Sequence, residues 1–189
     1  MKKLGEVENN IITGKTPSTT DEENFGGDIP FVTIDDIRQS KYISKTERTL
    51  TEKGGKLQKN KFVPAKSLCC SCIGTIGVIG FTSIKSQTNQ QINSIVFQND
   101  KNTEYIYFSL KHFFSNATVK TGNVFSNMNK EEFSSILLIL PPKEVINAFS
   151  EKTLPIFNYQ LTIQKEIQKL TDLRYRLLPL LMNGQVEVK

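Results

Sequence analysis

A seven-residue hydrophobic repeat dominates the last 47 residues of the chain. It places apolar side chains at Phe149, Ile156, Ile163, Leu170 and Leu177. Because this spacing puts side chains on one face of an α-helix, it predicts a long helix with an apolar stripe. A second helix is expected to begin at Pro155, because proline is favoured in a first helical turn. Pro179 and the following Asn183-Gly184 are expected to end it.

The stretch 155–178 would form a helix about 36 Å long, at 1.5 Å per residue. A domain of this size leaves little surface to cover such a helix, so we expect it to pair with a second helix in a coiled coil. The alternative is that the helix folds back on its own domain. The residues expected on the pairing face are Ile156, Ile163, Ile167, Leu170, Leu173, Leu177 and Leu181.

The first 142 residues have a different pattern, with short β-rich runs separated by Gly, Asn, Asp and Ser. These runs lie at 29–34, 67–72, 78–81, 93–97 and 136–140. Helical spacing predicts one helix over 103–115, and Asn129 is expected to cap a short helix over 130–134. We therefore expect an α+β fold: a mixed, mainly β globular domain over 1–142, followed by a long helical region over 143–189.

The net charge of +5 is unevenly distributed. Residues 20–36 hold six acids and no Lys or Arg, whereas residues 38–66 hold nine cations and two acids. A concentrated basic stretch is typical of proteins that bind a nucleic-acid backbone, because each neutralised phosphate releases counterions. The alternative is an ordinary lysine-rich surface in water.

The residues give no sign of a catalytic or metal site. Cys69, Cys70 and Cys72 lie in one segment without the second pair of ligands that a zinc site needs, so we interpret them as small hydrophobic residues on a strand. The only histidine, His112, is expected to be a partly buried helix residue, with no nucleophile motif before it. We expect no enzymatic activity, no metal and no cofactor.

The longest uninterrupted aliphatic run has five residues, 136–140, far fewer than the roughly 20 that cross a bilayer. The first residues do not lead into an apolar signal core. We therefore expect a cytoplasmic protein with reduced cysteines.

Five motifs in a fixed order resemble one half of the specificity subunit of a type I restriction–modification system. They are GKTPS at 14–18, GDIPFVTIDDI at 27–37, SCIGTIG at 71–77, TNQQI at 88–92 and LRYRLLPLLMNGQV at 173–186. The resemblance implies a DNA-reading target-recognition domain and one helical spacer region, without catalysis of its own. It also implies methyltransferase and restriction subunits as partners.

Full-length members of that family carry two recognition domains and two helical regions, each domain reading half of a bipartite site. This chain has one of each, so a homodimer is the economical way to complete the helix pair and the DNA site. The candidates for contact with double-stranded DNA are polar and basic residues in segments expected to be loops or to open the basic stretch. They are Lys15, Thr16, Ser18, Arg38, Lys41, Lys45, Gln90, Lys120, Thr121 and Asn123.

Three alternatives stay open at this point. Each candidate could be an ordinary solvated loop residue, and the amides of residues 89–91 could cap or bridge strands instead of contacting DNA. The chain could be a recognition fragment of a single-chain restriction–methylation enzyme. It could also be a dimeric interaction module without a role in DNA binding.

Overall fold

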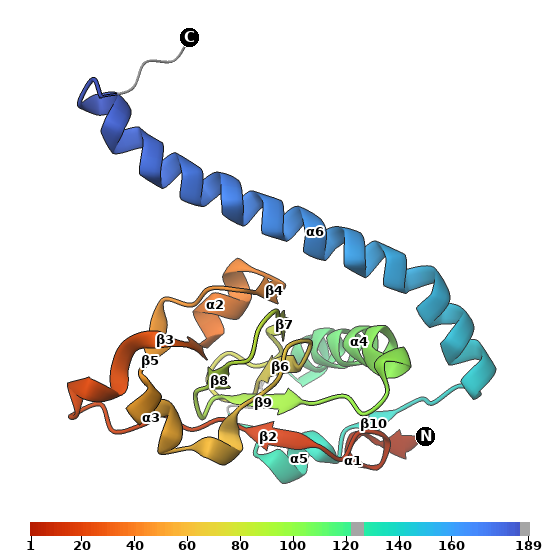
Figure 1. Cartoon of the computed structure of the whole chain (residues 1–189). Coiled ribbons are helices and arrows are strands. Elements are labelled where there is room, and N and C mark those ends of the chain that lie inside the picture. The colour runs from red at the N-terminus through yellow and green to blue at the C-terminus, as the bar shows by residue number, and fades with distance from the viewer. Residues whose placement is uncertain (122–126, 186–189) are drawn as a thin grey trace. The chain divides into compact units, whose positions relative to one another are not determined.

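The computed structural model describes residues 1–121 and 127–185, and for 117–121 it describes the backbone alone. The chain divides into two compact units, Met1–Ser150 and Glu151–Lys189. The first unit is a mixed α+β domain and the second consists of most of one long helix (Figure 1). The expected fold class is therefore correct.

Two small sheets form the centre of the domain. The larger has the order β2-β9-β6-β7-β4, and all its pairs are antiparallel except β4 with β7. The second has the order β5-β3-β8, with β3 and β8 parallel. The strands are β2 (Ile11–Thr13), β3 (Phe25–Val32), β4 (Tyr42–Ile43), β5 (Arg48–Leu50), β6 (Leu68–Ser71), β7 (Ile79–Thr82), β8 (Gln87–Thr88) and β9 (Ile92–Ile95).

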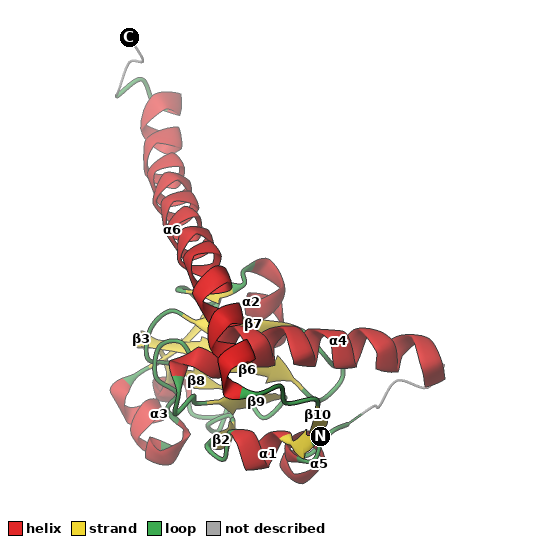
Figure 2. Cartoon of the chain, turned by 90° about the vertical axis from the view of Figure 1, so that its right-hand side faces the viewer, coloured by secondary structure: helices red, strands yellow, loops and turns green. Residues whose placement is uncertain are grey.

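Short helices surround these sheets. A two-stranded sheet of β1 (Lys2–Lys3) and β10 (Leu137–Leu138) joins the two ends of the domain, and α1 and α5 lie side by side next to it (Figures 1 and 2). The α-helices are α1 (Leu4–Val7), α2 (Ile34–Gln39), α3 (Glu52–Lys56), α4 (Thr103–Thr121), α5 (Lys130–Ser134) and α6 (Lys143–Met182). The 3-10 helices are η1 (Glu22–Asn24), η2 (Lys59–Lys61) and η3 (Asp100–Asn102).

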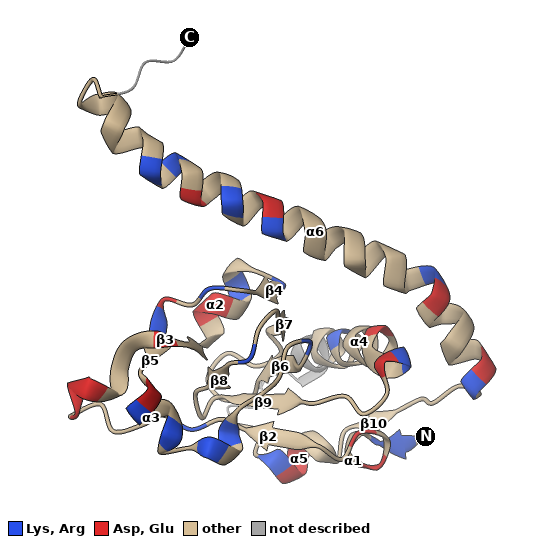
Figure 3. Ribbon diagram, in the orientation of Figure 1, with Lys and Arg blue, Asp and Glu red and all other residues tan. Residues whose placement is uncertain are grey.

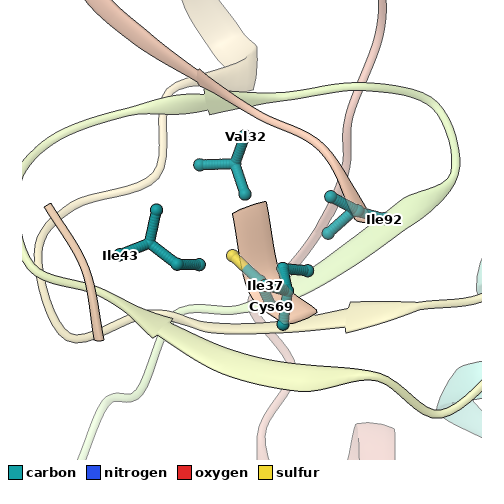
Figure 4. Packing of buried hydrophobic residues seen from close by; sticks show 5 residues of the cluster. All are labelled: Val32, Ile37, Ile43, Cys69 and Ile92. Atoms are coloured by element: carbon teal, nitrogen blue, oxygen red, sulfur yellow. The ribbon is translucent and has the colours of Figure 1, made fainter. Parts of the chain in front are cut away.

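The hydrophobic core joins both sheets to α2. Its centre is the buried cluster drawn in Figure 4, which consists of Val32, Ile37, Ile43, Cys69 and Ile92. Cys69 and Cys70 lie on β6 and Cys72 follows it; all three are free and buried. Burial raises the pKa of the Cys69 thiol to about 11, so this sulfur stays protonated and apolar. The interpretation of these cysteines as small hydrophobic residues is confirmed.

Most of the predicted elements are present. Each of the five predicted strands overlaps an observed one, and α5 begins after an Asn129 cap whose side chain accepts from the Glu132 backbone N–H at 2.9 Å. The helix predicted to end at residue 115 was placed too short, because α4 continues to Thr121. Lys120 and Thr121 therefore lie in the last turn of a helix rather than in a loop.

The break expected at Pro155 was wrong. Helix α6 runs through both Pro155 and Pro179 without interruption and ends at Met182. Proline removes one backbone N–H from a helix interior, so the helix continues here despite the loss of one hydrogen bond at each proline. The predicted end at Asn183-Gly184 is confirmed, since Gly184 has a left-handed φ of 65° and donates its N–H to Leu181. No helix in the described part of the chain could span a membrane.

Candidate nucleic-acid interface

Two polar loops meet at the carboxyl end of β8. The loop after β2 begins at Gly14, whose N–H donates to Ile92 at 3.0 Å, and the Lys15 N–H donates to the Thr88 carbonyl at 3.0 Å. A Cβ on Gly14 would lie only 2.1 Å from the Asn89 carbonyl oxygen. Glycine is therefore required where the two loops meet, and this contact places Lys15 and Thr16 beside residues 89–91.

Only one of the three consecutive amides faces solvent. Asn89 and Gln91 hydrogen-bond to each other at 3.0 Å, and the Gln91 side chain also donates to the Ile73 carbonyl at 3.4 Å. The Asn89 side chain thus closes a turn within its own loop, and the Gln91 side chain connects two loops, so neither amide bridges strands. Gln90 is exposed, and its side-chain oxygen accepts a hydrogen bond from the Thr16 hydroxyl. Thr16 and Gln90 therefore form one polar pair across the two loops.

A third loop, between β6 and β7, continues this surface. The Gln91 side chain reaches this loop by donating to the Ile73 carbonyl. In the same loop, the Thr75 hydroxyl accepts a hydrogen bond of 2.7 Å from the guanidinium of Arg38 on α2. Arg38 also forms an ion pair with Asp35 at 2.8 Å, yet about half of its side chain remains exposed. A series of side-chain contacts thus leads from the loop after β2 to the end of α2. We call five residues of this series the loop edge: the exposed Lys15, Gln90, Thr75 and Arg38, and the half-buried Thr16.

Glycines give the third loop its shape. Gly74 and Gly77 have left-handed φ angles of 77° and 85°. A Cβ on Gly77 would lie 2.6 Å from Cβ of Phe114, so the loop lies directly against α4. Thr75 is a candidate residue that the sequence prediction missed. The GTIG motif, with a hydroxyl between two turn-forming glycines, was the signal that could have identified it.

Ser18 lies at the far end of the loop after β2. Its hydroxyl is 2.7 Å from the hydroxyl of Thr20, and its carbonyl accepts from the Asn24 side chain at 3.1 Å. Asn24 belongs to η1, which carries two acids. Ser18 therefore lies next to a locally acidic turn, a less favourable place for a phosphate than the position of Lys15.

The structure places Lys41 against α4. Its ammonium nitrogen lies 4.6 Å from the ring centroid of Tyr107 and 5.2 Å from that of Tyr42. Partial burial, together with repulsion from Lys111, lowers the pKa of Lys41 to about 8, although Glu104 opposes the shift. Lys41 thus packs on aromatic rings instead of joining the loop edge. Lys45 is exposed in the turn after β4.

Three further candidates give less information. Lys120 and Thr121 lie in the last turn of α4, where the structure describes the backbone alone, and Asn123 lies outside the described residues.

The acidic and basic segments partly neutralise each other. Lys53 forms ion pairs with Asp21 at 3.0 Å and Glu23 at 2.6 Å, and Lys56 pairs with Glu52 at 2.8 Å. Figure 3 shows these charges of both signs gathered around η1 and α3. The basic stretch is therefore divided between ion-paired lysines and lysines that have no such partner in the described part of the chain.

His112 is exposed, contrary to the prediction of partial burial, and its Nε2 lies 2.8 Å from the Asn116 side-chain nitrogen. It lines an apolar groove of about 690 Å³ between α4, β10 and the first turns of α6. The predicted heptad residue Phe149 also lines this groove.

Among the described residues, no group of three or more His, Cys, Asp or Glu side chains could hold a metal ion.

Comparison with known proteins identifies the family of the chain. The family described as type I restriction modification DNA specificity domain matches residues 1–173. The chain belongs to this family. It is 40% identical, over 98% of its length, to the HindI type I restriction enzyme specificity subunit of Haemophilus influenzae. It is 33% identical, over 59% of its length, to the MjaIX specificity subunit of Methanocaldococcus jannaschii.

Solved structures of type I specificity subunits share the fold. The subunit from M. genitalium matches 94% of the chain with a TM-score of 0.62 and 14% identity. The HsdS subunit from Thermoanaerobacter tengcongensis matches 98% with a TM-score of 0.59 and 14% identity. The chain covers 41% of the HindI subunit, 25% of the MjaIX subunit, and 44% and 45% of these two structures, so it spans less than half of each relative.

Proposed function

We propose that the chain is a DNA-binding specificity element of a type I restriction–modification system, which reads one half of a bipartite target. Residues 1–142 serve as the recognition domain and residues 143–189 as the helical spacer. The main observation that supports this proposal is the loop edge, where three loops that are distant in sequence bring Lys15, Thr16, Gln90, Thr75 and Arg38 together. Such a specificity element directs chemistry without performing it.

The side chains of the loop edge have the chemistry that base reading needs. An arginine can donate two hydrogen bonds to guanine, a glutamine can pair with adenine, and threonine hydroxyls can contact either. Arg38 has its guanidinium held by Asp35 and Thr75, so its direction is fixed before DNA binds. Lys15, at the tip of a loop, is suited to a phosphate contact that fixes the position of the domain.

We also propose that the chain forms a homodimer through its long helix, α6. Six of the seven residues predicted on the pairing face of α6 are between 36% and 58% exposed; they are Ile156, Ile163, Ile167, Leu170, Leu173 and Leu181. A long helix with an exposed apolar stripe is stabilised by burying that stripe against another helix. A second copy of the chain would supply both the partner helix and the reader of the second half-site.

The proposed partners are double-stranded DNA and the methyltransferase and restriction subunits of the same system. The curated relatives are named as specificity subunits of type I restriction enzymes. We propose that the chain acts in the cytoplasm, where such an assembly would meet DNA. The proposal assigns no cofactor to this chain, because methyl transfer and cleavage belong to the partner subunits.

Methylome sequencing of cells with and without the gene tests the proposal. We expect one bipartite methylated motif to disappear when the gene is deleted and to return when it is restored. A strain with Arg38→Ala and Gln90→Ala should lose the motif or methylate a relaxed version of it. An unchanged methylome in the deletion strain would contradict the proposed function.

A further inference from the structure

Three lysines of the domain lie in two segments that pair with each other, and none of the three belongs to the loop edge; we call them the lysine surface. Lys59 and Lys61 are the first and last residues of η2, and Lys85 lies in the turn before β8. Within residues 1–121 and 127–185, none of the three forms an ion pair. The other lysines of this region differ, because acids neutralise Lys53 and Lys56.

Backbone contacts fix the position of this surface. Val63 and Ser86 exchange two hydrogen bonds of 2.9 Å, which bring the end of η2 beside Lys85. The buried Gln87 side chain donates to the carbonyls of Gly55 at 2.9 Å and Gln58 at 3.1 Å. These bonds attach the residues before η2 to β8. The two segments that carry the lysines are therefore fixed by hydrogen bonds to the rest of the domain.

An aromatic ring holds one of these charges, that of Lys85, beside the end of η2. The Lys85 ammonium nitrogen lies 4.5 Å from the centroid of Phe62, the residue that follows η2. A Cβ on Gly55 would lie 3.2 Å from the edge of the same ring, so the ring packs against α3. Lys85 thus stays beside Phe62, the residue that follows Lys61, with its charge available to solvent, since a cation on a ring face keeps its other donors free.

The lysine surface lies close to the loop edge. Both are connected to β8, with Lys85 before the strand and Lys15 bonded to Thr88 at its end. Three residue steps separate Lys85 from Thr88, which is at most about 10 Å at 3.3 Å per residue. The major groove of B-DNA is about 12 Å wide and has a phosphate strand along each side. Side chains of the loop edge in that groove would therefore bring the lysines to one of its phosphate strands.

We propose that Lys59, Lys61 and Lys85 form a phosphate-binding tract that contacts one DNA strand beside the half-site. This inference rests on the proposed DNA-binding function. The tract supplies affinity and sets the position of the domain, whereas the loop edge selects the sequence. Phosphate contacts carry no sequence information, so the two surfaces divide these tasks between them.

The test uses the full chain and a random-sequence DNA duplex of about 30 base pairs, measured by fluorescence anisotropy at several salt concentrations. The test variant combines Lys59→Gln, Lys61→Gln and Lys85→Gln. The matched control combines Lys53→Gln, Lys56→Gln and Lys66→Gln, which removes the same number of charges from lysines that form ion pairs. Thermal unfolding of both variants verifies that they are folded.

We expect the slope of log affinity against log salt to fall by about 2.7 in the test variant, because each phosphate that a lysine neutralises contributes about 0.9 to the slope. The control slope should fall by less than about 1. Equal decreases in both variants would indicate a general charge effect and overturn the tract. An unchanged slope in the test variant, with normal binding by the wild type, would also overturn it and leave the surface to an acidic protein partner. Absence of binding by the wild type would overturn the proposed function itself.

Discussion

Arg38 and Thr75 lie 37 positions apart in the sequence, and the guanidinium of Arg38 donates to the Thr75 hydroxyl at 2.7 Å. This contact joins the carboxyl end of α2 to the loop between β6 and β7. It also holds the guanidinium in one direction, because Asp35 binds its other terminal nitrogen at 2.8 Å. An arginine fixed in this way loses less conformational entropy on binding DNA than a free side chain would.

Replacement of Arg38 should therefore weaken DNA binding. We expect Arg38→Ala to cost about 1 to 3 kcal/mol on a duplex that carries the target motif, measured by anisotropy titration. Asp35→Asn provides the opposite control: the amide oxygen can still accept from the guanidinium and hold its direction, whereas the loss of a negative charge near the DNA should tighten binding. Equal affinities for the wild type and both variants would exclude Arg38 from the interface.

Lys15 and Gln90 should have separable effects. Lys15→Ala is expected to weaken binding to all duplexes equally and to lower the salt slope by about 0.9, the contribution of one neutralised phosphate. Gln90→Ala should leave the salt slope unchanged and reduce the preference for the target motif over random DNA. Thr19→Ala, in the same loop as Lys15 and also exposed, is the control for both variants. A salt slope that changes with Gln90→Ala and not with Lys15→Ala would reverse these assignments.

Gly14 is expected to be essential for the junction of the loops. A methyl group at this position would meet the Thr88 hydroxyl at 2.2 Å as well as the backbone of residues 88 and 89. We expect Gly14→Ala to lower the free energy of unfolding by about 1 to 3 kcal/mol in urea titrations, because backbone atoms cannot move aside cheaply. Thr19→Ala should change it by less than about 0.5 kcal/mol. A fully stable Gly14→Ala protein would contradict the close approach of the two loops.

The apolar stripe of α6 should control the oligomeric state. Ile163→Asp combined with Leu170→Asp is expected to give monomers in sedimentation velocity while the domain stays folded, because two buried charges would face the partner helix. The control variant combines Asn158→Asp with Thr162→Asp, which introduces the same number of carboxylates on exposed positions outside the stripe. Dimers that persist with the first variant would argue against pairing through this face.

Glu104 should make the stability of the domain depend on pH. Its carboxylate is buried and accepts a hydrogen bond from the Ser150 hydroxyl at 3.2 Å, and burial raises the pKa of this group above its usual value of 4.5. A carboxyl with a raised pKa in the folded state binds more protons there than in the unfolded chain. The stabilisation that Glu104 contributes is therefore complete below pH 4.5, the pKa of an ordinary glutamate. It is lost as the pH rises through the higher pKa that Glu104 has in the folded protein.

Glu104→Gln removes this titration and keeps an oxygen that can accept from Ser150. We expect the variant to gain free energy of unfolding relative to the wild type as the pH rises from about 4 to 7 in urea titrations, since only the wild type must charge the buried group. A difference between the two proteins that stays constant over this range would show that burial of Glu104 does not govern its titration.

Sequence patterns predicted the features that depend on neighbouring residues, and they missed those that depend on the tertiary structure. The Asn129 cap and its short helix were predictable because a cap and its first turn lie within four residues of each other. The continuation of α6 through Pro155 was not predictable, because proline in a sequence usually marks the start or the end of a helix. The exposure of His112 also escaped prediction, since it depends on which side of α4 the sheets cover.

The sequence by itself determined the family, the α+β class, the strands β3, β6, β7, β9 and β10, and the apolar stripe of the long helix, because these features depend on residue order and periodicity. It did not indicate β1, β2, β4, β5 or β8. It also indicated Lys15, Thr16, Gln90 and Arg38 as separate candidates. Only the tertiary structure decided that Thr75 joins them, that the Gln91 side chain connects two loops, and that Lys53 is neutralised while Lys59 has no ion pair among the described residues. The physical reason is that hydrogen bonds and ion pairs act over a few ångströms in space, between residues that the chain brings together only when it folds.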